Sequence, residues 1–160
     1  MIQNHGKKSN MPQNETSSGK SWITEKNNHA RKGNGTLLLV DDDSQLLVVS
    51  GSMLRSLGFE VIAVPSGAEA IEAVQCHATH LRAVLLDLMM PIMSGHETLK
   101  KLRSLARELP VIMFTGYSEE FVRKETKGHP YEGFIQKPLS LENLSAEIGR
   151  VLALKPVSPP

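Results

Sequence analysis

The stretch Thr36-Leu37-Leu38-Leu39-Val40-Asp41-Asp42-Asp43 joins a short apolar run directly to three aspartates. An unbroken apolar run is typical of a strand in a parallel sheet, because such a strand is covered on both faces. From Leu46 to Leu57 the apolar side chains recur at helical spacing, and Gly58 then marks the end of the helix. The stretch and its continuation therefore predict a strand, an acidic loop and a helix, in that order.

The same alternation continues to about residue 154. Further strands are expected at 61–64, 83–86, 111–114 and 133–135, and further helices at 68–74, 99–106, 118–126 and 141–152. Five strand–helix pairs predict an α/β fold with helices on both faces of a parallel sheet. Because crossovers are right-handed, the favoured topology is a flavodoxin-like doubly wound (βα)5 fold with strand order 2-1-3-4-5.

The segment before the first strand differs in composition from the rest. Residues 1–35 contain six Lys or Arg and two Glu, for a net charge of +4, which leaves −3 on residues 36–160. The segment has six apolar side chains and cannot bury enough surface to offset the entropy of ordering it. We expect a disordered leader or linker over 1–35, a folded domain over 36–154 and a flexible tail over 155–160.

The overall composition excludes several classes of protein. The 160-residue chain has a net charge of +1, which gives no reason to expect a nucleic-acid or membrane-binding surface. Its one cysteine, Cys76, cannot form an internal disulfide, and no apolar run approaches the roughly 20 residues that span a bilayer. The first 30 residues also lack the apolar core of a signal peptide. We therefore expect a soluble, cytoplasmic protein.

Polar residues stand where the first, third, fourth and fifth strands end. In a doubly wound sheet, strands 1 and 3 are neighbours at the switch point, so Asp41, Asp42 and Asp87 are expected to lie together. Three carboxylates this close need a proton or a cation, and an oxygen-only set favours Mg²⁺. Lys137 and Thr115 add a positive charge and a hydroxyl. Together these groups predict a pocket for a phosphoryl group.

Four motifs resemble the receiver domain of two-component response regulators. They are Val40-Asp41-Asp42-Asp43, Leu85-Leu86-Asp87-Leu88-Met89-Met90-Pro91 with Ser94-Gly95, Phe114-Thr115-Gly116, and Phe134-Ile135-Gln136-Lys137-Pro138. Each motif is common by itself, but all four occur in order, each at the end of its own expected strand. The resemblance covers residues 36–154, the whole of the expected folded domain.

The resemblance implies a role for each acidic residue. Asp87 would be the phosphoryl acceptor. Asp42 and Asp87 would bind Mg²⁺ directly, together with the backbone carbonyl of Met89, and Asp41 would act largely through a bound water. Asp43 falls outside this set, and we expect it to cap the first helix.

The resemblance also assigns the residues that follow the fourth and fifth strands. Thr115 and Lys137 would hold the phosphoryl oxygens, and Gly116 would leave space beside them. Phe134 stands where the family has a switching aromatic residue. The peptide bond between Lys137 and Pro138 is expected to be cis.

The implied function is that of a phosphoacceptor in a two-component phosphorelay. A histidine kinase or a histidine phosphotransfer protein would supply the phosphoryl group, and the changed conformation would act on a downstream protein target. Such a domain assists its own phosphorylation but is a signalling domain rather than an enzyme. Because only the six residues 155–160 follow the expected domain, no DNA-binding domain is expected there, and the chain could be a stand-alone regulator or the terminal receiver of a hybrid histidine kinase.

The sequence also allows three other functions to be compared with this one. A degenerate receiver would act only as a protein-interaction module, although the acidic set with Thr115 and Lys137 is complete. A flavin-binding protein of the same fold would need a loop that cradles phosphate after the first strand, where Asp41–Asp43 would repel it. A phosphatase with an aspartyl nucleophile usually has a second acid two residues after the nucleophile, and Met89 occupies that position.

Overall fold

The computed structural model describes residues 33–154. Residues 1–32 of the leader expected over 1–35, and the whole tail expected over 155–160, lie outside the described residues. The five strands are β1 (Thr36–Val40), β2 (Glu60–Val64), β3 (Leu81–Leu86), β4 (Val111–Thr115) and β5 (Gly133–Gln136). The five helices are α1 (Ser44–Ser56), α2 (Gly67–His77), α3 (Gly95–Leu105), α4 (Glu119–Glu125) and α5 (Leu141–Ala153).

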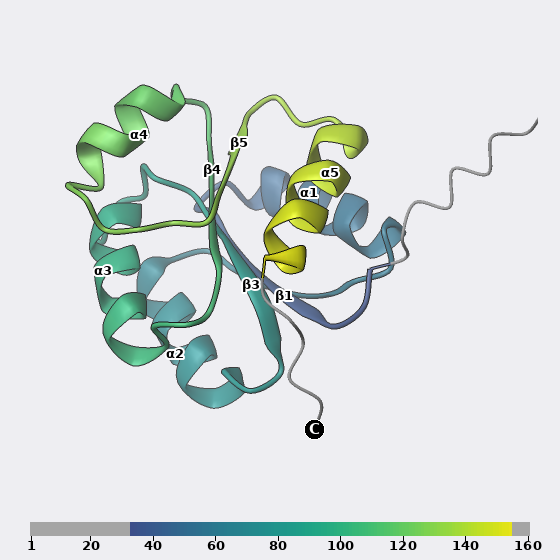
Figure 1. The fold of residues 1–160 in the computed structure, drawn as a ribbon, viewed down its shortest axis with the longest axis horizontal. Coiled ribbons are helices and arrows are strands. Elements are labelled where there is room, and N and C mark those ends of the chain that lie inside the picture. Colours follow the sequence, from purple (N-terminus) through teal and green to yellow (C-terminus); the bar gives the residue numbers. More distant parts are fainter. Residues whose placement is uncertain (1–32, 155–160) are drawn as a thin grey trace, which may run out of the picture.

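The strands form one parallel sheet in the order β2-β1-β3-β4-β5, which confirms the predicted doubly wound topology. Figure 1 shows α1 and α5 on one side of the sheet and α2, α3 and α4 on the other. All five carboxyl ends of the strands consequently point to the same edge of the molecule, where the connections into the helices begin.

Two apolar cores lie on the two faces of the sheet. Alternate side chains of β1 point to opposite faces, so Leu38 and Val40 pack under α2 and α3 whereas Leu37 and Leu39 pack under α1 and α5. All four side chains are completely buried. This arrangement explains the unbroken apolar run that opens the domain, because each of its residues has a core to enter.

Each helix begins at a side chain that accepts a hydrogen bond from the first helical turn. The five N-cap residues are Asp43, Ser66, Ser94, Ser118 and Ser140. The expected role of Asp43 is confirmed, since its Oδ1 accepts from the backbone N–H groups of Gln45 (2.8 Å) and Leu46 (3.1 Å). These caps fix where each loop at the carboxyl edge of the sheet ends and its helix starts.

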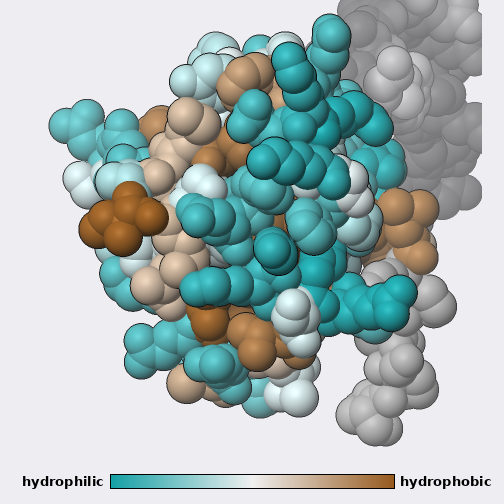
Figure 2. Space-filling view, turned by 90° about the vertical axis from the view of Figure 1, so that its left-hand side faces the viewer, coloured by the Kyte–Doolittle hydropathy of each residue, from teal (hydrophilic) through white to brown (hydrophobic). Residues whose placement is uncertain are grey.

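One face of the domain can be judged from its hydropathy. Figure 2 views the side formed by α2, α3 and α4, where hydrophobic residues are scattered among hydrophilic ones. Within residues 33–154, no helix combines the length and the apolar character that crossing a membrane requires.

Candidate functional site

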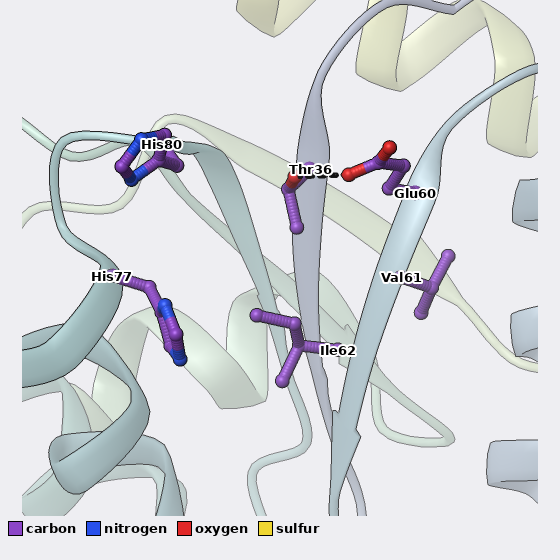
Figure 3. A pocket seen from close by; sticks show the side chains of 6 residues that line it. All are labelled: Thr36, Glu60, Val61, Ile62, His77 and His80. Carbon is purple, nitrogen blue, oxygen red and sulfur yellow. Dashed lines mark hydrogen bonds between the residues drawn. The ribbon is translucent and has the colours of Figure 1, made fainter.

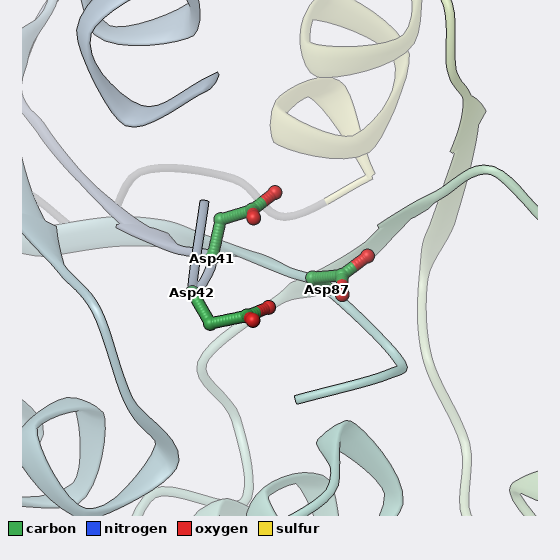
Figure 4. Close-up of side chains that lie close together, drawn as sticks. All are labelled: Asp41, Asp42 and Asp87. Atoms are coloured by element: carbon green, nitrogen blue, oxygen red, sulfur yellow. The ribbon is translucent and has the colours of Figure 1, made fainter. Parts of the chain in front are cut away.

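Three carboxylates meet where β1 and β3 end. Val40 and Leu86 are partners in the sheet, so Asp41 and Asp87, which follow them, become neighbours. The N–H of Asp87 donates to the carbonyl of Val40 at 2.9 Å, which continues the pairing beyond the strands. Figure 4 shows the side chains of Asp41, Asp42 and Asp87 together at this edge. One oxygen from each lies within 4.8 Å of the others.

A lysine from the far side of β4 reaches two of these carboxylates. The Nζ of Lys137 lies 2.5 Å from Oδ2 of Asp41 and 3.2 Å from Oδ1 of Asp87. Its side chain crosses the end of β4, with Nζ 4.5 Å from the centroid of the Phe114 ring. The backbone N–H of Lys137 donates to the carbonyl of Thr115, which fixes the backbone of Lys137 beside the end of β4.

The three carboxylates have different surroundings. Asp41 is 1% exposed and Asp87 is 6% exposed, whereas Asp42 is open to solvent. Burial raises the pKa of Asp87, and the ammonium of Lys137 opposes this effect. The cluster therefore contains more negative charge than its single lysine neutralises, and its exposed side is formed by Asp42.

Backbone groups hold the buried carboxylates in place. Oδ2 of Asp87 accepts from the N–H of Met89 at 3.1 Å, and Oδ1 of Asp41 accepts from the N–H of Asp43 at 2.9 Å. The loop after β3 then passes very close to the start of α3. A Cβ atom on Gly95 would lie 2.1 Å from the backbone oxygen of Asp87, so a side chain at this position would displace the loop.

The residues expected to hold and sense the phosphoryl group lie on β4, on β5 and in the loops that follow these strands. Thr115 is buried at the end of β4, and a Cβ atom on Gly116 would meet nothing within 4 Å. Phe134 is half-buried on the face covered by α2, α3 and α4. The peptide bond between Lys137 and Pro138 is cis.

Three contacts in the domain were not identified from the sequence. Glu147 of α5 accepts from the backbone N–H of Phe134 at 2.9 Å. The rings of His96 and His129, for which the sequence identified no partners, have centroids 5.5 Å apart, and Tyr117 stacks on Phe121 with centroids 4.7 Å apart. The first two contacts join segments far apart in the sequence and left no signal in it. The i,i+4 spacing of Tyr117 and Phe121 is a sequence signal for the third contact.

A family model described as the response regulator receiver domain matches residues 37–149. The chain belongs to this family. The receiver domain is 30% identical over 120 residues to the sensor kinase CckA of Brucella abortus, and 33% identical over 117 residues to the transcriptional regulatory protein ZraR of Escherichia coli K12. These alignments cover 75% and 73% of this chain but 13% and 26% of the two relatives, so the chain spans only a small part of their length.

Solved receiver structures share the fold. The chemotaxis protein CheY4 of Vibrio cholerae is 27% identical with a TM-score of 0.68, and the match covers 74% of this chain and 99% of CheY4. A chain from the CheX–CheY–BeF3–Mg²⁺ complex of Borrelia burgdorferi is 26% identical with a TM-score of 0.69, covering 78% of this receiver domain and 96% of that chain. A sensor histidine kinase receiver domain from Pseudomonas aeruginosa, solved with magnesium in its active-site cleft, has a TM-score of 0.69 at 24% identity, with 76% of this chain and 99% of that chain covered.

Proposed function

We propose that this receiver domain accepts a phosphoryl group on Asp87 from a phosphohistidine of a partner protein, and that the product changes the domain's conformation. The observation that carries the proposal is the position of the Lys137 ammonium between the buried carboxylates of Asp41 and Asp87. This geometry leaves one oxygen of Asp87 hydrogen-bonded to the loop and places a positive charge beside the other. Family membership supports the same assignment.

The carboxylate cluster fits a hard divalent cation. Its donors are oxygens, the three groups converge within 4.8 Å, and their combined charge exceeds that of Lys137. In the proposed site, Asp42, Asp87 and the carbonyl of Met89 would hold Mg²⁺, and Asp41 would act through a water. When bound, Mg²⁺ would neutralise charge on the phosphoryl oxygens.

The transfer is a displacement at phosphorus. A carboxylate oxygen of Asp87 forms the new bond while the bond from phosphorus to the partner's imidazole nitrogen breaks, and that nitrogen takes a proton from solvent. Lys137 donates to a phosphoryl oxygen as the charge spreads over the loose transition state. The product adds about one negative charge and three acceptor oxygens at Asp87. Thr115 would then donate to one of these oxygens and Phe134 would adjust its position.

The partners follow from this chemistry. The donor is a histidine kinase or a histidine phosphotransfer protein, and the recipient of the signal is a downstream protein. We propose that the reaction takes place in the cytoplasm, and that this chain contacts neither nucleic acid nor a membrane. Two kinds of parent protein fit, a stand-alone regulator and a hybrid histidine kinase. The gene sequence on either side of these residues distinguishes them.

Phosphorylation by a small donor tests the proposal. With acetyl phosphate and Mg²⁺, we expect the intact mass to increase by one acid-labile phosphoryl group. Asp87→Asn and removal of the metal by a chelator should both abolish the gain. Asp43→Asn is the matched control, because Asp43 caps α1 and does not belong to the cluster. An acid-stable product, or equal labelling of Asp87→Asn, contradicts the proposal, and no labelling of the wild type supports a degenerate receiver instead.

A further inference from the structure

The outer edge of β5 is bound by a side chain rather than by another strand. β5 is the last strand of the sheet, and such a strand has backbone groups with no strand to pair with. The N–H of Phe134 is one of these groups, and it donates to Oε1 of Glu147 on α5 at 2.9 Å. α5 therefore contacts the backbone of the residue expected to act as the switch.

Arg150 holds this glutamate and a second backbone group of the same edge. Its Nε donates to Oε2 of Glu147 at 2.8 Å, and its Nη2 lies 2.6 Å from Oε1. The same Nη2 donates to the carbonyl of Glu132 at 2.7 Å. We call Glu147 and Arg150 the α5 clasp, because together they bind the backbone on both sides of Gly133, the first residue of β5.

Helix α5 lies close against the backbone at the start of β5. A Cβ atom on Gly133 would lie 2.7 Å from Cγ2 of Val151 and 2.9 Å from Oε1 of Glu147, so α5 packs directly against this backbone. The side chain of Glu132 is held from the opposite side by Arg103 of α3, at 2.7 Å. The beginning of β5 is consequently fixed from two helices.

β5 connects the clasp to the acidic cluster. Lys137, three residues after Phe134, binds Asp41 and Asp87 through its ammonium. A phosphoryl group on Asp87 would attract the Lys137 ammonium to the phosphoryl oxygens. Because Lys137 directly follows β5, a strand of four residues, this movement would pull on the carboxyl end of β5. The clasp borders a cavity of about 400 Å³ that Tyr131 and residues of α4 also line, so the side chains there have space to rearrange.

We propose that Glu147 is a positioning residue that fixes the backbone of Phe134 and transmits its movement to α5. This inference rests on the proposed function, because the movement is attributed to phosphorylation of Asp87. An exposed Glu–Arg pair alone contributes little to stability, but a carboxylate that satisfies a backbone donor at a sheet edge also determines where that strand lies. The hydrogen bonds from Arg150 and Phe134 also lower the pKa of Glu147, so the bonded form is the charged one.

Hydrogen exchange measured with and without acetyl phosphate and Mg²⁺ tests the inference in the whole chain. In Glu147→Ala, we expect the Phe134 amide to exchange roughly fivefold faster than in the wild type, as for loss of one hydrogen bond. Phosphorylation of Asp87, followed by intact mass, should be unchanged. The change in α5 exchange that accompanies phosphorylation should be lost. Glu142→Ala, an exposed glutamate in the first turn of α5, is the matched control and should behave as the wild type.

A second variant covers the case in which Glu147→Ala fails to fold. Glu147→Gln keeps an acceptor oxygen for the Phe134 amide, so it should restore the slow exchange and part of the α5 response. The inference is overturned if phosphorylation changes the hydrogen exchange of α5 as much in Glu147→Ala as in the wild type, or if it does not change α5 exchange in the wild type. Either result leaves the proposed function intact. If the wild type takes up no phosphoryl group, the proposed function fails, and the proposed coupling to α5 fails with it.

Discussion

The two ends of β1 both carry polar residues, yet only one end gathers them into a buried cluster. At the amino end, a cavity of about 330 Å³ is lined by Thr36, Glu60, His77 and His80 together with two apolar residues. Figure 3 shows the two imidazoles on one side of Thr36 and Glu60 on the other, where Thr36 donates to Glu60 at 3.1 Å. At the carboxyl end, Asp41 directly follows the last residue of β1, is 1% exposed and is bound by Lys137.

The difference lies in the access of water. Glu60, His77 and His80 are exposed, so water solvates their polar groups. Asp41 and Asp87 are nearly inaccessible, so each depends on a lysine, backbone donors or a bound cation. In this domain, the charged groups at the carboxyl end of β1 differ from those at its amino end because the sheet both buries them and brings them together. The following predictions test this contrast, from the largest expected effect to the smallest.

Removing the ammonium at the carboxyl end should have the largest effect. Lys137→Met leaves Asp41 and Asp87 with no lysine between them, and breaking a buried ion pair in this way costs about 3 kcal/mol. We expect the free energy of unfolding in metal-free buffer to fall by about this amount, measured by urea denaturation. Lys101→Met, at an exposed position of α3, is the control. Equal losses in the two variants would show that the buried pairing is unimportant.

The carboxylates should contribute unequally to cation binding. Asp42→Ala removes a proposed direct ligand and should weaken Mg²⁺ binding more than Asp41→Ala, for which we expect a loss of roughly tenfold because its contact is through water. Titration calorimetry measures both affinities. The opposite ranking would place Asp41 in direct contact with the ion and Asp42 outside it.

Removing the charge of Asp87 should stabilise the metal-free domain. Burial raises the pKa of Asp87, so the folded state binds this proton more tightly than the unfolded chain does. The ionised carboxylate therefore costs stability above its folded-state pKa, and the cost disappears as the pH falls through that pKa toward the ordinary value of 3.8. At pH 7, Asp87→Asn should unfold roughly 3 °C higher than the wild type.

Calorimetry over a range of pH checks both the size and the sign of this effect. The difference between Asp87→Asn and wild type should shrink as the pH is lowered, because the wild-type carboxyl group then becomes neutral as well. A variant that is less stable than wild type at pH 7 would show that the hydrogen bonds of Asp87 to Lys137 and Met89 outweigh the cost of burying its charge.

The smallest effects are expected at the amino end. The triple variant Glu60→Gln, His77→Gln and His80→Gln should change the free energy of unfolding by less than about 0.5 kcal/mol, because all three side chains are exposed. Its Mg²⁺ affinity and its phosphorylation should equal those of the wild type. A change in either property would mean that the two ends of β1 are coupled.

The sequence by itself determined the order of the elements and the location of the acidic cluster. The spacing of apolar residues identified all five strands and all five helices. A helix buried on one face repeats apolar residues every three to four positions, and a strand buried on both faces is an unbroken apolar run. The cluster followed because the topology of a doubly wound sheet brings the ends of β1 and β3 together whatever the details of packing. The cap at Asp43 was predictable because it is a contact within four residues.

Tertiary structure alone decided how the surface elements meet. The contact of Glu147 with the Phe134 amide depends on how α5 is rotated and how closely it approaches Gly133. The approach of His96 to His129 likewise depends on where α3 begins and where the loop after α4 passes. Periodicity shows which face of a helix is buried, but it contains neither the distance between a helix and its neighbours nor the side chain that meets a given backbone group. Those contacts are set when the whole core packs, because packing fixes the position of every helix to within the width of a side chain.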